Sequence, residues 1–164
     1  MKKSNRLLSV IILATAIAML FSTISCQKQD TEADIAAINK MYDQYLIYIN
    51  TGDLDNLLSL WDDNAISMVP DNAPIIGKDN IRKSFEAQFE PFNLNSVIYG
   101  NIRIEVDSDM ALGSSNYILE LTPKEGGPTI RIDGKQVSIF KRQTDGSWKI
   151  YINISNNNAP PTVE

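Results

Sequence analysis

The spacing of apolar residues changes between residues 92 and 98, and this change constrains the fold more than any other feature of the chain. Before it, apolar residues recur every three or four positions, most clearly at Ile35, Ile38, Tyr42, Tyr45, Leu46 and Ile49. After it, they alternate with polar residues, as at Ile98, Ile102, Ile104 and Val106. The first spacing predicts amphipathic helices, and the second predicts strands with one buried face. Helices followed by antiparallel strands indicate the α+β class.

Three helices are predicted in the first half of the chain. The first begins near Thr31, where Thr-Glu-Ala-Asp is typical of a capping box, and Gly52 ends it. Asp53 caps a second helix. Gly77 precedes a third helix, which Pro91 ends. The apolar faces of the second and third helices are expected on Leu54, Leu57, Leu58 and Trp61, and on Ile81, Phe85, Phe89 and Phe92.

One short strand and four long strands are predicted as well. The short strand covers residues 65–69, and Pro70 ends it. The long strands follow with alternating apolar residues, over residues 98–106, 111–121, 130–142 and 148–154. Residues 107–109 and 145–146 have the composition of hairpin turns.

Residues 1–26 have the pattern of an export signal. Lys2, Lys3 and Arg6 form a basic start, and residues 7–21 are almost wholly apolar. The apolar run is short for a permanent membrane span, which needs about 20 residues. We therefore expect a signal peptide that is removed on export.

Cys26 is the only cysteine of the chain and lies where this signal ends. The segment Ser22-Thr23-Ile24-Ser25-Cys26 resembles the processing site of bacterial lipoproteins, which implies a diacylglycerol attached to Cys26. Acyl chains would then bind the protein to a membrane of the bacterial cell envelope, and Gln27 favours the outer membrane. The alternative is an ordinary signal and a secreted or periplasmic soluble protein. Residues 27–31 would form a polar tether in either case.

The chain contains no histidine, and Cys26 is assigned to the lipid anchor. A Ser-His-Asp or Cys-His nucleophile is therefore excluded, as are disulfides and zinc sites built from His or Cys. Only carboxylates, tyrosine, lysine, arginine and hydroxyl groups remain for acid-base chemistry. We expect neither a cofactor nor a metal.

The mature protein is acidic. Removal of the three basic residues of the signal reduces 15 basic residues to 12, against 20 acidic residues, which changes the net charge from -5 to -8. Nucleic-acid phosphates require a basic surface, so a nucleic-acid partner is not expected. The remaining length fits one domain with a single core.

Several short motifs in the mature chain resemble the nuclear-transport-factor-2-like superfamily, and in particular its SnoaL-like and ketosteroid-isomerase-homologue domains. They are Gly52-Asp53-Leu54-Asp55, Trp61-Asp62-Asp63-Asn64-Ala65, Pro70, Gly77-Lys78, Phe140-Lys141-Arg142 and Asp145-Gly146-Ser147-Trp148-Lys149-Ile150. The resemblance implies a cone-shaped α+β barrel over residues 32–156, with three helices packed on a curved antiparallel or mixed sheet. Residues 157–164 would form a polar tail. Ketosteroid isomerase, scytalone dehydratase and polyketide cyclases share this fold.

The resemblance also places the isomerase site on this sequence. Its oxyanion-binding tyrosine corresponds to Tyr45, its proton-shuttling aspartate to Val69 and its buried acid to Ser138. Valine cannot accept a proton, so ketosteroid isomerisation by that mechanism is disfavoured. The scytalone dehydratase type of site relies on histidine, which this chain lacks.

The residues predicted to line a pocket are Tyr45, Trp61, Met68, Val69, Tyr99, Tyr117 and Ser138. Tyr45 is either a hydrogen-bond donor to a ligand or one more core aromatic residue. We expect non-catalytic binding of a small apolar or amphipathic ligand, a homodimer through the sheet, or both. The alternative is an isomerase, dehydratase or cyclase that combines Tyr45 with an inward-pointing carboxylate such as Glu120 or Asp133.

Overall fold

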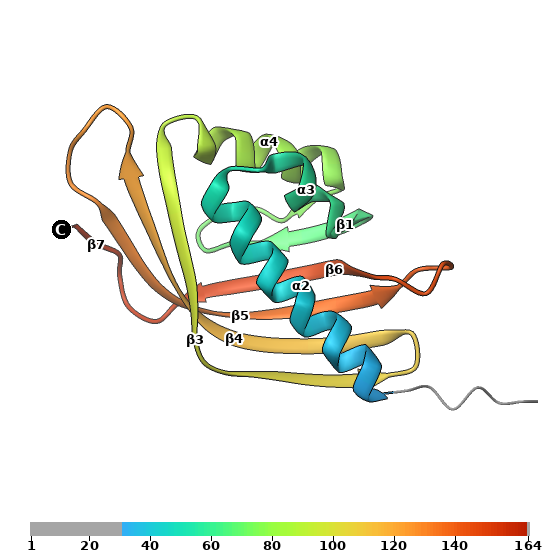
Figure 1. The fold of residues 1–164 in the computed structure, drawn as a ribbon. Helices are drawn as coiled ribbons and strands as arrows, with labels where there is room; N and C mark the ends of the chain where they lie inside the picture. Colours follow the sequence, from blue (N-terminus) through green and yellow to red (C-terminus); the bar gives the residue numbers. More distant parts are fainter. Residues whose placement is uncertain (1–30, 164) are drawn as a thin grey trace, which may run out of the picture. The chain divides into compact units, whose positions relative to one another are not determined.

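The computed structural model describes residues 31–163, so the predicted signal, Cys26 and most of the tether lie outside the described residues. Within residues 31–163, three helices are present, α2 (Thr31–Thr51), α3 (Leu54–Ser59) and α4 (Lys78–Phe89). The strands are β1 (Trp61–Met68), β2 (Ile75–Ile76), β3 (Phe92–Asp107), β4 (Met110–Pro123), β5 (Ile130–Arg142), β6 (Trp148–Asn157) and β7 (Thr162–Val163). Figure 1 shows the three helices on one face of the curved sheet.

The sheet is mixed. Its strands follow the order β2-β1-β6-β5-β4-β3, and β7 pairs with β5. Strands β1 and β6 run parallel, whereas all other neighbours are antiparallel. Within residues 31–163, β2 and β3 lie at opposite ends of this order and do not pair. The prediction of an α+β fold with helices on a curved mixed sheet is therefore confirmed, but the sheet is open and does not close into a barrel.

Local signals position the helical hairpin as predicted. Helix α2 begins at Thr31 and is followed by Gly52, whose φ of 69° lies in the left-handed region that glycine adopts without steric cost. The side chain of Asp53 then accepts a hydrogen bond of 3.2 Å from the backbone N–H of Asn56, which caps α3. The hairpin sets α2 across the concave face of the sheet.

Several element boundaries differ from the prediction, and the short strands β2 and β7 were not predicted. Helix α3 ends at Ser59, and the backbone oxygen of Leu60 accepts a hydrogen bond of 2.8 Å from the N–H of Ile150. This bond draws the chain into the sheet, so Trp61 begins β1 instead of ending a helix, and β1 starts four residues earlier than predicted. Phe92 pairs with Pro123 in β3 and does not extend the apolar stripe of α4.

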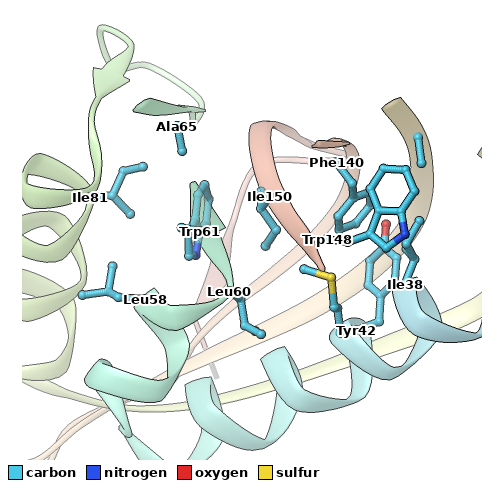
Figure 2. Close-up of a cluster of buried hydrophobic side chains, with 12 residues drawn as sticks. Ile38, Tyr42, Leu58, Leu60, Trp61, Ala65, Ile81, Phe140, Trp148 and Ile150 are labelled. Atoms are coloured by element: carbon cyan, nitrogen blue, oxygen red, sulfur yellow. The ribbon is translucent and has the colours of Figure 1, made fainter. Parts of the chain in front are cut away.

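The hydrophobic core lies between the helices and the concave face of the sheet. Ile38 and Leu57 are fully buried, and Trp61 and Phe140 are 2% exposed. Figure 2 shows that Trp61 lies among residues of α3, α4 and β6, whereas Tyr42 and Ile38 of α2 lie near Phe140 and Trp148. Burial of apolar side chains of this size stabilises a fold by about 1.5–3 kcal/mol each.

One buried ion pair fixes the beginning of α2 to the sheet. Both oxygens of Asp34 accept hydrogen bonds from Arg142, at 2.9 and 2.6 Å. Trp148 Nε1 donates to the same carboxylate at 3.2 Å, and the guanidinium of Arg142 lies 4.2 Å from the centroid of the Trp148 ring. Arg142 holds the pKa of Asp34 below its usual value. We call these three residues the α2 clamp.

Candidate functional site

A cavity of about 510 Å³ lies between α2, α4 and the concave face of the sheet. Helix α2 contributes Tyr45, and α4 contributes Ser84 and Phe85. All strands from β1 to β6 contribute residues, and the exposed loop after β1 contributes Asp71 and Asn72 at the rim. This volume is within the range of small-molecule sites in proteins, which hold about 300–1,000 Å³.

One wall of the cavity is apolar. Trp61 and Phe85 meet edge to face, with ring centroids 6.2 Å apart. Trp61 is the first residue of β1 and Phe85 lies in the middle of α4, so the contact also fixes α4 on the sheet. The remaining apolar lining residues are Leu46, Ile49, Val69, Pro70, Ile75, Ile81, Ala87, Ile98, Leu119 and Ile132.

The floor of the cavity, opposite the apolar wall, is polar, and strands β5 and β6 form much of it. Alternate residues of a strand point to the same face, so the inward positions of β5 and β6 lie in facing pairs. Gln136 pairs with Ser155 in this register, and Asn157 pairs with Gly134. Asn153, two residues before Ser155, shares their face and also lines the cavity.

A chain of hydrogen bonds orients the amides of this floor. Gln136 Nε2 donates to Ser115 Oγ at 3.1 Å. Asn153 Nδ2 donates to Gln136 Oε1 at 3.3 Å and to Ser138 Oγ at 2.9 Å. Both amide hydrogens of Asn153 are therefore used within the protein. Its Oδ1 has no hydrogen-bond partner among residues 31–163.

Two tyrosines complete the polar side of the cavity. Burial raises the pKa of Tyr45, and the nearby phenol of Tyr117 raises it further. Burial also raises the pKa of Tyr117, against the opposing effect of a hydrogen bond with Ser155. Both phenols therefore stay protonated at neutral pH and are available as hydrogen-bond donors.

Gly134 sets the position of the Tyr117 ring. The two residues are direct partners across β4 and β5. A Cβ atom at position 134 would overlap this ring and lie only 2.6 Å from its hydroxyl oxygen. The absence of a side chain at Gly134 thus allows the aromatic ring to lie across the neighbouring strand, with its phenol at the cavity.

Ionisable groups other than tyrosine are scarce around the cavity. Asp71 is the one carboxylate among its described lining residues, and these include no lysine or arginine. Asp71 is exposed and has a φ of 60°, an uncommon conformation for a residue with a side chain, although aspartate adopts it more readily than most. The interior of the cavity therefore presents neutral amides, hydroxyls and phenols.

Four of the predicted pocket residues line this cavity, namely Tyr45, Trp61, Val69 and Tyr117. Ser138 lies beside it and borders a much smaller void of about 10 Å³. Its hydroxyl accepts the hydrogen bond from Asn153, so it contributes to the floor through that amide.

Met68 and Tyr99 were expected in the pocket but lie elsewhere. Each is adjacent in sequence to a residue that lines the cavity, Ser67 for Met68 and Ile98 for Tyr99. Because side chains alternate along a strand, Met68 and Tyr99 point to the opposite face of the sheet. There, the Tyr99 hydroxyl donates to Asp133 Oδ1 at 2.7 Å.

The same alternation directs the two candidate catalytic carboxylates away from the cavity. Leu119 and Ile132 line it, so their neighbours Glu120 and Asp133 face outward. Glu120 instead forms an ion pair of 2.6 Å with Arg131 across strands β4 and β5. The hydrogen bond from Tyr99 holds the pKa of Asp133 below its usual value.

The sequence prediction missed Gln136 and Asn153, the two amides at the centre of the floor. The alternation of side chains along β5 could have indicated Gln136, because Gln136 and Ser138 point to the same face as the buried Phe140. In β6, by contrast, the run Asn153-Ile154-Ser155-Asn156-Asn157 is polar at nearly every position, and its composition alone favours an exposed tail.

No helix within residues 31–163 combines the length and the apolar character needed to span a membrane.

Several solved structures resemble this fold. The putative scytalone dehydratase of Novosphingobium aromaticivorans aligns with a TM-score of 0.74 at 18% identity, over 82% of this chain and 89% of that one. The hexachlorocyclohexane dehydrochlorinase LinA-type3 of Novosphingobium barchaimii aligns with a TM-score of 0.72 at 24% identity, over 82% of this chain and 92% of that one. A ketosteroid isomerase-like protein of Erwinia carotovora atroseptica aligns with a TM-score of 0.66 at 20% identity, over 76% of this chain and 96% of that one.

These identities establish a shared fold and leave the reaction open. No curated protein matches the sequence. The SnoaL-like domain family, by contrast, matches residues 30–151, which is well over half of the chain. Within the described part of the chain, this match covers helices α2, α3 and α4, strands β1 to β5 and the first residues of β6. The chain therefore belongs to the SnoaL-like domain family.

Proposed function

We propose that this domain binds a small amphipathic molecule in its cavity without transforming it. The observation that carries this proposal is the cavity of about 510 Å³ with an apolar wall on one side and hydrogen-bonding amides and phenols on the other. Such a division suits a ligand with an apolar body and a polar end. It also provides hydrogen bonds that fix the orientation of the ligand.

The positions that would move protons support binding over catalysis. Val69, which the resemblance matches to the base of the isomerases, lines the cavity, and Ser138, matched to their buried acid, borders the small void beside it. Glu120 and Asp133 are engaged on the other face of the sheet. General acid-base catalysis needs a group within hydrogen-bond reach of the reacting proton, and the tyrosines alone are weak bases at neutral pH.

A binding assay with N-phenyl-1-naphthylamine, an uncharged and apolar fluorophore, tests this proposal. We expect its fluorescence to rise on binding to the wild-type protein. Ser84→Trp should reduce the rise, because Ser84 lines the cavity and the indole would occupy part of its volume. Lys83→Trp, on the exposed face of the same helix, is the matched control and should bind normally. No rise with the wild-type protein, or an equal rise with both variants, would contradict the proposal.

An isomerase, dehydratase or cyclase is the second candidate, and the position of Asp71 favours it. Asp71 supplies a carboxylate to the same cavity that Tyr45 lines. A base on the rim and a phenol inside the cavity would be the minimum set for proton transfer. Turnover of an enone or hydroxyketone by the wild-type protein, lost in both Asp71→Asn and Tyr45→Phe, would establish an enzyme and overturn the binding proposal.

We further propose that the domain is held at the bacterial cell envelope, at the outer membrane, by a lipid on Cys26. The support is the sequence pattern of residues 1–26, and Cys26 lies five positions before the start of α2 at Thr31. Cys26→Ser should release the protein from the membrane fraction. Equal retention of the variant would rule out this anchor.

A homodimer through the outer face of the sheet is also proposed. Val137 and Ile154 are direct partners on β5 and β6, and each is 36% exposed, while Leu112 nearby on β4 is 40% exposed. Exposed apolar side chains that cluster in this way favour a protein contact. Sedimentation velocity should give a dimer for the wild-type protein and a monomer for Val137→Glu, and a monomer for both would refute the contact.

A further inference from the structure

We propose that the cavity selects an uncharged polar group that donates a hydrogen bond to Asn153 Oδ1, and that Asn153 is the residue that determines this specificity. The inference rests on the proposed binding function and names the chemical class of its ligand. That class is a neutral molecule with an apolar body and a head group that both donates and accepts, such as a primary amide.

The orientation of the Asn153 amide is fixed by its neighbours. Its Nδ2 donates to Gln136 Oε1 and Ser138 Oγ, and Gln136 is itself held by a bond to Ser115. Rotating the Asn153 amide alone by about 180° would place its oxygen against the oxygen of Gln136, which repels it. The network therefore uses both amide hydrogens of Asn153 within the protein and leaves its oxygen, Oδ1, free to accept a hydrogen bond from a ligand.

This acceptor is open to the cavity. Among residues 31–163, the buried side-chain atoms without a hydrogen-bond partner are Tyr42 Oη, Trp61 Nε1 and Arg142 Nε. Asn153 Oδ1 also lacks a partner but is not one of them, so it is accessible from the space that Asn153 lines. A ligand that donates a hydrogen bond to this oxygen would satisfy it.

The charge of the surroundings excludes ionised ligands. No lysine or arginine is found among the described lining residues, so a carboxylate would lose its hydration without gaining a counter-ion. Its oxygens would also meet the oxygen of Asn153, and the acidic chain as a whole, with a net charge of -5, would repel it. A cation would find its one carboxylate, Asp71, only at the rim.

The two tyrosines supply the complementary donors. Tyr117 lies close enough to Tyr45 to raise the pKa of its phenol, and both tyrosines line the cavity. Neither phenol donates to the side chains that form the hydrogen-bonded floor, namely Ser115, Gln136, Ser138 and Asn153. A head group with an acceptor beside its donor would therefore be bound from both sides, while its apolar body would lie against Trp61 and Phe85.

Three probes with the same ring system test the inference by displacement of N-phenyl-1-naphthylamine. They are 2-naphthamide, which is neutral with donor and acceptor, methyl 2-naphthoate, which is neutral with acceptors only, and 2-naphthoate, which is charged. At pH 7 we expect 2-naphthamide to bind at least about tenfold more tightly than 2-naphthoate, which loses its hydration, and about fivefold more tightly than the ester, which cannot donate to Asn153 Oδ1.

Variants assign the effect to one residue. Asn153→Leu should remove the preference for 2-naphthamide over the ester. Asn156→Leu makes the same change at an exposed residue on the opposite face of the same strand and should leave all three affinities unchanged. Thermal unfolding of each variant shows whether it is folded. The wild-type ratio of amide to carboxylate tests the inference even if Asn153→Leu does not fold.

The outcomes separate this inference from the function on which it rests. If the fluorophore binds and all three probes displace it equally, binding stands and the specificity is overturned. If Asn153→Leu keeps the amide preference, Asn153 does not determine it. If neither the fluorophore nor any probe binds, the binding function itself fails and the specificity fails with it.

Discussion

Two polar clusters lie between α2 and strands β5 and β6, and they differ in how their hydrogen bonds are used. The α2 clamp takes Asp34 from α2, Arg142 from β5 and Trp148 from β6. The cavity floor takes Gln136 from β5 and Asn153 from β6, and Tyr45 of α2 faces the same cavity. The same three elements thus build both clusters, at different distances along their length.

The difference shows which cluster is structural. In the clamp, both oxygens of Asp34 accept hydrogen bonds from the two terminal nitrogens of Arg142, the remaining Arg142 Nε is buried 3.5 Å from Asp109 Oδ1, and neither Asp34 nor Arg142 lines the cavity. In the floor, Asn153 Oδ1 has no partner within residues 31–163 although the amide itself is held in place. Polar groups that satisfy one another stabilise the fold, whereas oriented groups that remain open to a cavity favour binding.

The largest effect is expected from breaking the clamp. Asp34→Ala leaves Arg142, whose side chain is only 19% exposed, without its main partner. We expect the free energy of unfolding to fall by about 2 kcal/mol, less than the loss of about 3–5 kcal/mol for a fully buried pair, because the pair is partly exposed and Asp109 remains near Arg142. Urea denaturation measures it. Binding of the fluorophore should persist in the folded variant, and its loss would show that the two clusters are coupled.

The clamp should also respond to acid, with a smaller effect. The hydrogen bonds from Arg142 hold the pKa of Asp34 below its usual value of 3.8. The stability that this pair contributes is therefore present above pH 3.8 and is lost as the pH falls through the lower pKa of the folded state. In urea denaturation at pH 7 and pH 3, Asp34→Asn should lose less stability on acidification than the wild type.

Two observations check the acid effect. Asp79→Asn, at an exposed position of α4, serves as the control and should keep the wild-type loss. Binding of 2-naphthamide should stay constant between pH 5 and pH 8, because the cavity tyrosines have raised pKa values. An equal loss in Asp34→Asn and the wild type would mean that other carboxylates cause the acid sensitivity.

A change on the cavity side of β5 should affect binding more than stability. Gly134→Ala would bring a Cβ atom to 2.6 Å from the Tyr117 hydroxyl oxygen and displace the ring. We expect a loss of about 1 kcal/mol in stability, as for modest overpacking, together with weaker binding of 2-naphthamide. Gly113→Ala is the counterpart beside Tyr42, outside the cavity, and should destabilise the fold without a specific effect on binding.

The smallest change is expected from Tyr45→Phe. It removes one hydroxyl and keeps the ring, so stability should remain within about 0.5 kcal/mol of the wild type. Affinity for 2-naphthamide should fall about threefold to tenfold, as for one neutral hydrogen bond. Isothermal titration calorimetry measures the change. Unchanged affinity would show that Tyr45 is only a core aromatic residue.

Local signals in the sequence were sufficient for most of the fold. Gly52 and Asp53 define the helical hairpin because their preferences depend on their own backbone and nearest neighbours. Strand β5 was predicted over residues 130–142 and has those bounds. The sequence prediction placed Trp61 in a helix because Leu58 and Trp61 share helical spacing. The hydrogen bond from the N–H of Ile150 to the oxygen of Leu60 joins residues far apart in the sequence, and it places Trp61 in a strand.

The site was less predictable because it depends on register between strands that are far apart in sequence. Tyr99 and Tyr117 look alike in the sequence, but the pairing of Ile98 with Tyr117 places Tyr117 inward and Tyr99 outward. Asn153 is part of the floor because β6 pairs with both β1 and β5, opposite Ser67 and Ser138. No local preference of an asparagine indicates such a position.

The place of β6 in the sheet has a consequence for biosynthesis. This strand is the last long one to leave the ribosome, yet it lies inside the sheet between β1 and β5. A nascent chain that lacks it would expose two unpaired strand edges and have no Asn153, and such edges promote aggregation. Ligand binding and resistance to proteases should therefore both arise only when translation of the domain is complete.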